Sequence, residues 1–247
     1  MGGNSSLLPQ HVHASWEPFL EETGYGLLER IAPQIVNGEA FTPGPEHMLR
    51  FLGLDLEAVK VLILGQDPYP QPGVATGRAF EVGPLKSWTT PFRNTSLRNI
   101  VRALYAAVHN EKLTFKEIVG KLKSASNEFP LLAPDQLFRY WELQGVLLLN
   151  TSFSCEQGKP GSHAALWRPF TLALIAYINR SNPDIYWLLW GNHAQEAVGH
   201  IVPNNCLVSC HPMICHQREG DFLYGDINHF NATRGLIDWV GVHHAKS

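Results

Sequence analysis

Four short runs of apolar residues stand out along the chain, and each is bounded by turn-forming or polar residues. They cover positions 61–64, 146–149, 185–189 and 206–209. Short, continuously apolar runs are typical of strands that are buried in a parallel sheet. The pattern therefore predicts four buried strands.

Helical periodicity lies between these runs. Over positions 95–108 the apolar residues fall on one helical face, with Thr95 or Ser96 as the expected cap, and positions 167–178 and 192–201 also have helical character. Strands that alternate with helices predict an α/β fold, with a central four-stranded parallel sheet covered by helices on both faces. Pro and Gly are spread evenly and no linker interrupts the pattern, which predicts a single domain over 1–247 with residues 1–15 flexible.

Composition narrows the class of protein. Hydrophobic residues make up 45% and charged residues 17% of the 247 residues, which is typical of a globular domain. No apolar run is long enough for a transmembrane helix, and the start of the chain does not resemble a signal peptide. It fits the pattern for myristoylation at Gly2, but this pattern is so permissive that a plain polar start is the better explanation.

The net charge limits the kinds of partner that the chain can bind, and the cysteine content indicates its compartment. The net charge of −3 argues against binding nucleic acid by bulk charge, although it allows a local basic or polar face. Four sparse cysteines predict a reducing compartment without a disulfide framework. We therefore expect a cytoplasmic protein, or a nuclear one if the host is eukaryotic or the source viral.

Polar residues directly follow each predicted strand, where parallel α/β sheets bind their ligands. Asp67, Asn150 and His211 follow three of the strands, and the turn at Gly191 and Asn192 follows the fourth. These side chains should therefore meet at one edge of the sheet, in a site assembled from separate segments of the chain.

Each of these residues has a structural and a chemical interpretation. Asp67 could form an Asx turn, or its carboxylate could orient water and stabilise positive charge. Asn150 could cap a loop or read a base edge with its amide, and His211 could be a buried structural histidine or donate to an oxygen that gains charge. Phe80 could be core or a stacking platform for a planar ring.

Other chemistries find little support. Cys206, Cys210 and Cys215, with His211 and His216, lack the paired spacing of a structural zinc site, so we predict no metal. Dinucleotide, nucleoside-triphosphate and serine-hydrolase motifs are also missing from the sequence.

Several segments, in order along the chain, together resemble family-1 uracil-DNA glycosylases. The match runs from about residue 16 to residue 239 and is carried by GQDPY (65–69), QGVLLLNT (144–151), SH (162–163), LLWGNHAQ (188–195), HP (211–212) and IDW (237–239). The resemblance implies a monofunctional enzyme that flips deoxyuridine out of DNA and hydrolyses its N-glycosidic bond without a cofactor, which begins base-excision repair.

The resemblance also implies roles for individual residues. Asp67 would stabilise the positive sugar and position the attacking water, and a neutral His211 would donate to uracil O2 as it becomes negative. Asn150 would form hydrogen bonds with O4 and the N3 proton. Cytosine presents the opposite pattern of donor and acceptor on this edge and would leave the amide mispaired. Phe80 would stack on the base and Tyr69 would occupy the space of a thymine methyl.

Further contacts are implied at the edge of the pocket. Gln66 would give the base a backbone hydrogen bond. The residues implied to contact DNA are Ser96, Ser162, Gly191, Asn192, Pro212, Met213 and Ile214. The partners implied are uracil-containing DNA, single- or double-stranded, and a phage-encoded DNA-mimic inhibitor; we expect a monomer and no membrane association.

The chain departs from the family pattern in four places. Pro70 stands where the family has His, and residues 88–96 match the family's proline-rich loop poorly. Gly191-Asn192 replaces Gly-Ser. After His211-Pro212 the usual Leu wedge is missing, which leaves either Met213 or Ile214 as the wedge. An insertion at 217–226 carries three carboxylates, so we expect either that they face away from DNA or that the enzyme prefers single strands or mismatches, whose bases flip at lower cost.

These departures leave two alternatives open. The chain could be a non-catalytic protein that binds uracil-DNA or a polymerase, or an enzyme of the same fold whose specificity has shifted to another deaminated base.

Overall fold

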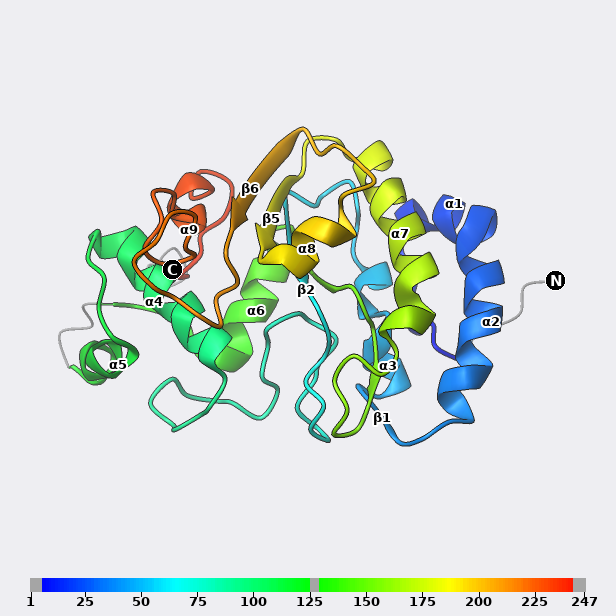
Figure 1. The fold of residues 1–247 in the computed structure, drawn as a ribbon, viewed down its shortest axis with the longest axis horizontal. Helices are drawn as coiled ribbons and strands as arrows, with labels where there is room; N and C mark the ends of the chain where they lie inside the picture. Colours follow the sequence, from blue (N-terminus) through cyan, green and yellow to red (C-terminus); the bar gives the residue numbers. More distant parts are fainter. Residues whose placement is uncertain (1–5, 125–128, 242–247) are drawn as a thin grey trace.

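A four-stranded parallel sheet forms the centre of the part that the computed structural model describes, residues 6–124 and 129–241 (Figure 1). Its strands, in the order β3-β2-β5-β6, are β2 (Val61–Gly65), β3 (Val146–Asn150), β5 (Tyr186–Trp190) and β6 (Asn205–Ser209). All three neighbouring pairs are parallel. The four predicted strands are confirmed, each to within one residue at either end.

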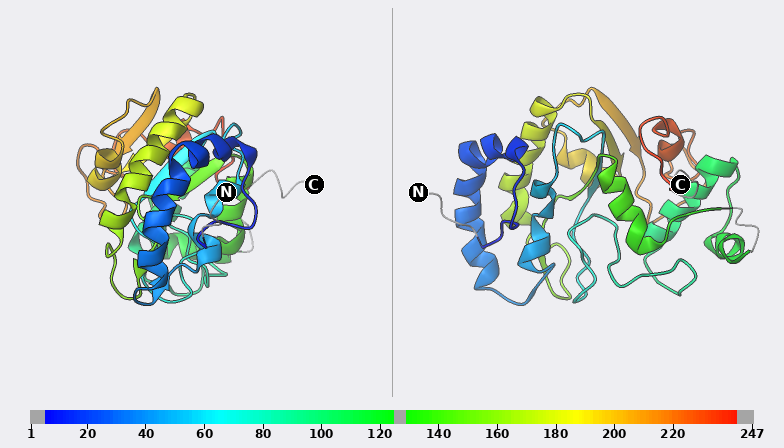
Figure 2. Two further views of the ribbon diagram at one scale, coloured as in Figure 1. Left: turned by 90° about the vertical axis from the view of Figure 1, so that its right-hand side faces the viewer. Right: turned by 180° about the vertical axis from the view of Figure 1, so that it is seen from behind.

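Helices cover both faces of this sheet, as predicted. Alternate residues of β2 point to opposite sides, so that Leu62 and Leu64 join one hydrophobic core while Val61 and Ile63 join the other. The first core is covered by α1 (Glu17–Phe19), α2 (Tyr25–Val36) and α7 (Ala164–Ser181), which lie to the right of the sheet in Figure 1. The second is covered by α4 (Thr95–His109), α6 (Pro134–Leu143) and α9 (His229–Ala232), and Figure 2 shows the same two layers from the side and from behind.

Shorter elements complete the fold. They are the helices α3 (Pro45–Met48), α5 (Phe115–Lys123) and α8 (Asn192–Ala197), the one-turn segments η1 (Ala14–Trp16), η2 (Leu20–Gly24) and η3 (Arg50–Gly53), and the strands β1 (Phe41–Thr42) and β4 (Cys155–Glu156). The last two pair antiparallel in a small separate sheet. Within the described ranges, no helix has both the length and the apolar character needed to cross a membrane.

Three of the expectations for individual elements are wrong. Strand β6 is not buried: it is the edge of the sheet, and Cys206 and Val208 are exposed. The helix that precedes it, α8, ends at Ala197 instead of residue 201 and packs against β5, so one face of β6 has little cover. Helix α4 begins at Thr95, but the N-cap residue is Asn94 and no side chain caps the helix. The Asn94 side chain instead hydrogen-bonds to Tyr69.

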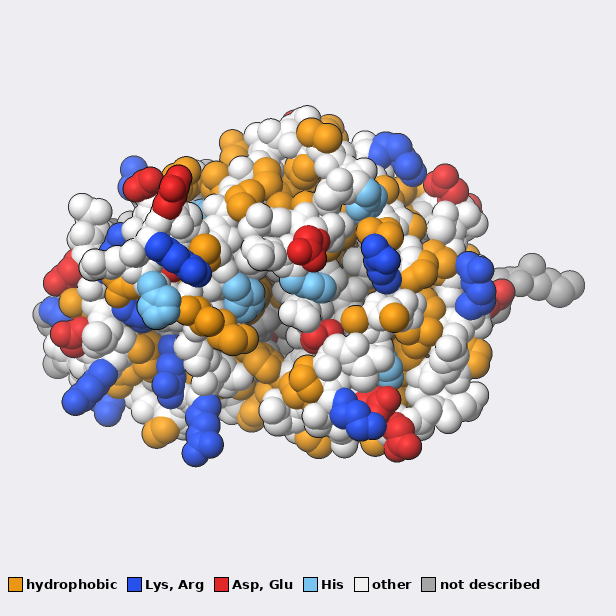
Figure 3. Space-filling view, in the orientation of Figure 1, with side chains coloured by type: hydrophobic (Ala, Val, Ile, Leu, Met, Phe, Trp, Pro, Cys, Tyr) orange, Lys and Arg blue, Asp and Glu red, His pale blue; other side chains and the backbone are white. Residues whose placement is uncertain are grey.

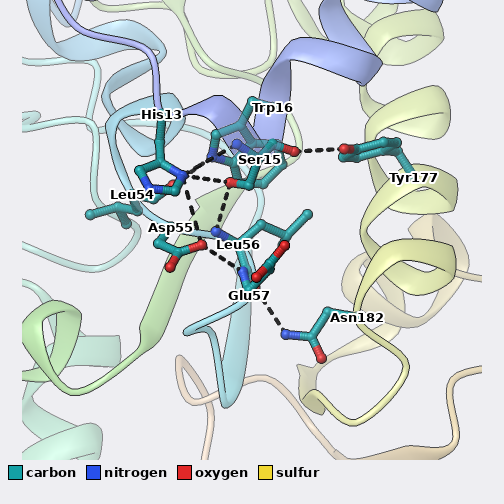
Figure 4. Close-up of polar contacts among 9 residues, drawn as sticks. All are labelled: His13, Ser15, Trp16, Leu54, Asp55, Leu56, Glu57, Tyr177 and Asn182. Carbon is teal, nitrogen blue, oxygen red and sulfur yellow. Dashed lines mark hydrogen bonds and ion pairs between the residues drawn. The ribbon is translucent and has the colours of Figure 1, made fainter.

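Part of the N-terminal segment, which we expected to be flexible, packs against the rest of the protein. Leu7 is fully buried, and the Ser15 hydroxyl accepts a hydrogen bond from the Leu56 backbone N–H at 3.0 Å. The Tyr177 hydroxyl donates to the Ser15 carbonyl at 2.6 Å, and Asn182 donates to the Leu56 carbonyl at 2.9 Å (Figure 4). These bonds tie the segment to α7 and to the loop before β2. Gly2 lies outside the described residues.

Candidate active site

A pocket of about 280 Å³ opens at the carboxyl ends of β2 and β3. Figure 3 shows a hollow near the centre of the corresponding face, with histidine side chains around it and Lys and Arg side chains to either side. The side chains singled out from the sequence that line the pocket are Gln66, Asp67, Tyr69, Phe80, Ser96, Asn150, His211 and Met213. The expected convergence of separate segments at this edge of the sheet is therefore observed.

Asp67 lies two residues beyond β2 and is half-buried in the pocket wall. Its Oδ1 is buried and has no hydrogen-bond partner among the described residues, which does not favour an Asx turn. Burial raises the pKa of Asp67, while the nearby His193 acts in the opposite direction. The pocket therefore holds a partly desolvated carboxylate with a free oxygen, a group suited to stabilising a developing positive charge.

Backbone and hydroxyl contacts fix the turn before Asp67. The Thr151 backbone N–H donates to the Gly65 carbonyl at 3.0 Å, and the Thr151 hydroxyl donates to the Gln66 carbonyl at 3.0 Å. The same hydroxyl lies 2.6 Å from His193 Nε2. Thr151 and His193 therefore link the Asp67 turn to β3 and α8. The sequence places both residues beyond strand ends but gives no sign of this contact between them.

Asn150 ends β3 beside Gly65, the last residue of β2, and is only 6% exposed. A side chain at position 65 would collide with the Asn150 carboxamide, so glycine is required there for the amide to lie at the base of the pocket. The amide is therefore held by the sheet itself, with donor and acceptor atoms on one group.

His211 follows β6, and its proton can be placed from one contact. The Met213 backbone N–H donates to Nδ1 at 3.1 Å, so the neutral imidazole carries its proton on Nε2. Burial and the neighbouring His193 both lower the pKa of His211, which favours this neutral form. Gly191, at φ +89°, packs against the ring, and a Cβ there would lie 2.7 Å from that of His211. Gly191 therefore allows the close approach of the imidazole.

Two aromatic residues shape the pocket. Phe80 is half-buried at φ +67°, and its ring centroid lies 5.3 Å from that of Trp190 and 6.2 Å from that of His211. Burial raises the pKa of Tyr69 to about 12, against the opposing effect of its hydrogen bond to Asn94, so the phenol is neutral. The pocket therefore has aromatic walls with few exposed charges.

The residues expected to contact DNA have different surroundings. Met213 and Ile214 are exposed by 57% and 54%, and Asn192 is exposed at the start of α8. Ser162 is exposed, but its hydroxyl accepts the Glu156 backbone N–H at 2.7 Å. Pro212 departs from the expectation of a surface contact because it is buried, and its carbonyl accepts a hydrogen bond from Asn99 at 2.6 Å.

The insertion at 217–226 closes around Asp221, which is buried and points inward. Its Oδ2 accepts the His216 backbone N–H at 2.9 Å, and its Oδ1 accepts those of Leu223 and Tyr224 at 2.9 and 3.0 Å. Burial opposes ionisation, but these N–H groups more than offset it and lower the pKa of Asp221. Next to it, Phe222 packs on Trp190 with ring centroids 4.9 Å apart, so the insertion supports a wall of the pocket.

A buried charge network beside the pocket was not found from the sequence. Arg78 lines the pocket and forms ion pairs with Glu81 and Glu142, while Arg50 lies 3.7 Å from Glu142. Glu142 is 64 residues from Arg78, and nothing in the sequence pattern connects them. All four cysteines are free thiols, and the described residues contain no group of three or more His, Cys, Asp or Glu placed to bind a metal.

Comparisons with known proteins agree with this geometry. A family model described as the uracil DNA glycosylase superfamily matches residues 54–231. The chain is 35% identical over 243 residues to a uracil-DNA glycosylase of Pseudomonas paraeruginosa, covering 93% of this chain and 91% of that protein. It is 32% identical to uracil-DNA glycosylase 1 of Listeria monocytogenes, covering 91% and 96%.

Solved structures give the same result for the fold. The structure of wild-type UNG from Nitratifractor salsuginis has a TM-score of 0.64 at 27% identity, with 82% of this chain and 85% of that chain covered. The mimivirus UNG Y322L structure, described in complex with UGI, has a TM-score of 0.64 at 26% identity and covers 85% and 73%.

Proposed function

The chain belongs to the uracil-DNA glycosylase superfamily, and from this premise we propose that its pocket removes uracil from DNA by hydrolysing the N-glycosidic bond of deoxyuridine. The proposal rests on one observation: a single pocket of about 280 Å³ is lined by Asp67, Phe80, Asn150 and His211. These residues come from four separate segments, and each offers a different group that the reaction needs.

Asp67 is proposed to face the sugar. As the glycosidic bond breaks, the sugar becomes oxocarbenium-like, and a carboxylate within the pocket stabilises that charge. The buried Oδ1, which has no partner among the described residues, is the acceptor that would orient the attacking water.

His211 is proposed to stabilise the leaving uracil. The base departs with negative charge on O2, and the Nε2 proton of the neutral imidazole is available to donate to it. The lowered pKa of His211 suits this role because the imidazole then stays uncharged at neutral pH.

Specificity is proposed to come from three side chains. Asn150 would accept the N3 proton and donate to O4, whereas cytosine presents a mismatched pattern that leaves the buried amide mispaired. Tyr69 would exclude the methyl group of thymine, and Phe80 would stack on the flipped base. Gln66 would add a backbone hydrogen bond to the base.

The DNA is proposed to lie across the mouth of the pocket, with Ser96 and Asn192 contacting phosphates. Met213 lines the pocket and Ile214 is exposed beside it, so these two residues would form the apolar wedge that supports base flipping. Because the mimivirus structure is described in complex with UGI, we propose that UGI would bind this chain too, over the same face. We also propose that the chain acts as a monomer.

Incubation with oligonucleotides that carry one uracil, followed by alkali, tests the proposal. We expect strand scission at uracil in single strands and in U:A and U:G duplexes, and none at thymine or cytosine. Absence of cleavage on all three uracil substrates would refute it. A tight complex without turnover would instead indicate a non-catalytic uracil-binding protein, and cleavage at hypoxanthine alone would indicate a shifted specificity.

A further inference from the structure

The turn over residues 76–81 carries Phe80 into the pocket in an uncommon backbone conformation. Phe80 has φ +67°, a region that bulky side chains rarely adopt. Such a conformation costs free energy and persists only where the surrounding structure enforces it. The contacts that enforce it here therefore determine where the Phe80 ring lies.

Contacts on the N-terminal side of Phe80 hold part of this turn. Arg50 donates through Nη1 to the Thr76 carbonyl at 3.1 Å. Gly77, at φ +84°, lies so close to the His47 carbonyl that a Cβ would collide with it. The Ala79 backbone N–H donates to the Leu148 carbonyl of β3 at 3.3 Å.

Charged side chains on both sides of Phe80 hold the rest. Arg78 and Glu81 flank it at 9% and 7% side-chain exposure, and Arg78 Nη1 lies 3.0 Å from Glu81 Oε2. The Thr76 hydroxyl donates to the same Oε2 at 2.5 Å. Through Nη2, Arg78 also pairs with Glu142 of α6, whose side chain is 12% exposed. Arg78 therefore connects the turn to a helix of the second core.

We propose that Arg78 is a positioning residue for the glycosylase reaction, because its bridge between Glu81 and Glu142 holds the Phe80 ring where it stacks on uracil. This inference rests on the proposed function. Arg78 is not assigned a direct role on the anionic base, since two buried carboxylates beside it offset its charge. Its effect should then pass through Phe80.

A double-mutant cycle between positions 78 and 80 tests this route. In the wild-type background, Arg78→Met should lower kcat/KM on single-stranded uracil DNA by about tenfold and weaken inhibition by free uracil by a similar factor. In the Phe80→Ala background, Arg78→Met should change kcat/KM by less than about twofold. Equal losses in both backgrounds would overturn the proposal, because Arg78 would then act independently of the ring.

Two further variants separate positioning from a loss of folding. Glu142→Gln weakens the same bridge from outside the pocket, and it should show the same dependence on Phe80 even if Arg78→Met does not fold. Arg78→Lys keeps a cation at the site and should recover part of the lost uracil affinity. Full activity of Glu142→Gln with unchanged uracil inhibition would contradict the proposal.

The matched control is Lys86→Met. Lys86 pairs with Asp135 of the same helix α6 at 3.4 Å, but its side chain is 68% exposed, so we expect unchanged kinetics. Wild-type protein that does not release uracil would refute the proposed function, whereas active wild-type protein with additive effects at positions 78 and 80 would refute only the role of Arg78.

Discussion

Replacement of Asp221 by Asn should weaken activity on duplex DNA more than on single strands. Asp221 lies in the loop that follows the exposed Met213 and Ile214, and its Oδ2 accepts the His216 backbone N–H at 2.9 Å. Asparagine can keep an acceptor for the Leu223 N–H but would set an NH₂ group against that of His216. The segment 213–216, which carries Met213 and Ile214, would then lose the hydrogen bond that holds it to the loop.

The size of the effect follows from the bond that is lost. A hydrogen bond to a charged group contributes about 1.5–3 kcal/mol, and about 1.4 kcal/mol corresponds to a factor of ten. Loss of the bond to His216 should therefore lower kcat/KM on a U:A duplex by between about tenfold and about 150-fold. A single-stranded substrate needs no duplex opening and should change by less than about threefold.

Paired rate measurements on one sequence, as a duplex and as a single strand, decide the question. Asp226→Asn is the control, because Asp226 is an exposed carboxylate in the same loop and should leave both rates unchanged. Because the pKa of Asp221 is lowered, its stabilising effect is present above its unfolded value of about 3.9 and is lost as pH falls through the folded pKa. Equal losses on the two substrates, or an equal effect of Asp226→Asn, would refute the reasoning.

Three further predictions concern the pocket. Asp67→Asn should remove most of the cleavage rate but retain binding of uracil-DNA, and weakened binding in a gel-shift assay would contradict this. The substitution should not lower Tm at pH 7. The pKa of the Asp67 carboxyl is raised in the folded protein, so its contribution to stability is lost as the pH rises through the folded pKa. Tyr69→Ala should release thymine from T-containing single strands, and a variant that cleaves uracil alone would show that the phenol does not exclude the methyl group. The pH profile of kcat/KM should fall at acid pH, because Asp67 must be ionised and His211 neutral, and its midpoint should lie above the value of a free Asp carboxyl, about 3.9, because burial raises the pKa of Asp67. Activity that rises as the pH falls below neutrality would exclude the assigned protonation states.

Much of the site could be predicted from local sequence patterns. Apolar runs mark buried strands whatever the rest of the chain does, and the carboxyl ends of parallel strands meet at one edge. Asp67, Asn150 and His211 follow such runs, so their convergence is predictable before any relative is considered. Ser96 is different, since only its position in the resemblance identified it as a residue that contacts DNA.

Surroundings that depend on distant segments could not be predicted in this way. The pattern at 206–209 indicates a strand, but whether Val208 is covered depends on the length of α8 and on what packs beyond the sheet edge. The sequence around Asp221 is typical of an exposed loop, and only the folded structure shows that its carboxylate accepts hydrogen bonds from three backbone N–H groups.

The positions of the strands along the chain, the fold class and the polar residues at the strand ends are thus properties of the sequence alone, because side-chain periodicity and turn formation act over a few neighbouring residues. The order of the strands within the sheet, the exposure of β6 at its edge and the pairing of Arg78 with Glu142 arise only in the tertiary structure. They depend on residues that are far apart in the chain and meet when the two cores pack, and on the loss of water that makes a buried charge require its partner.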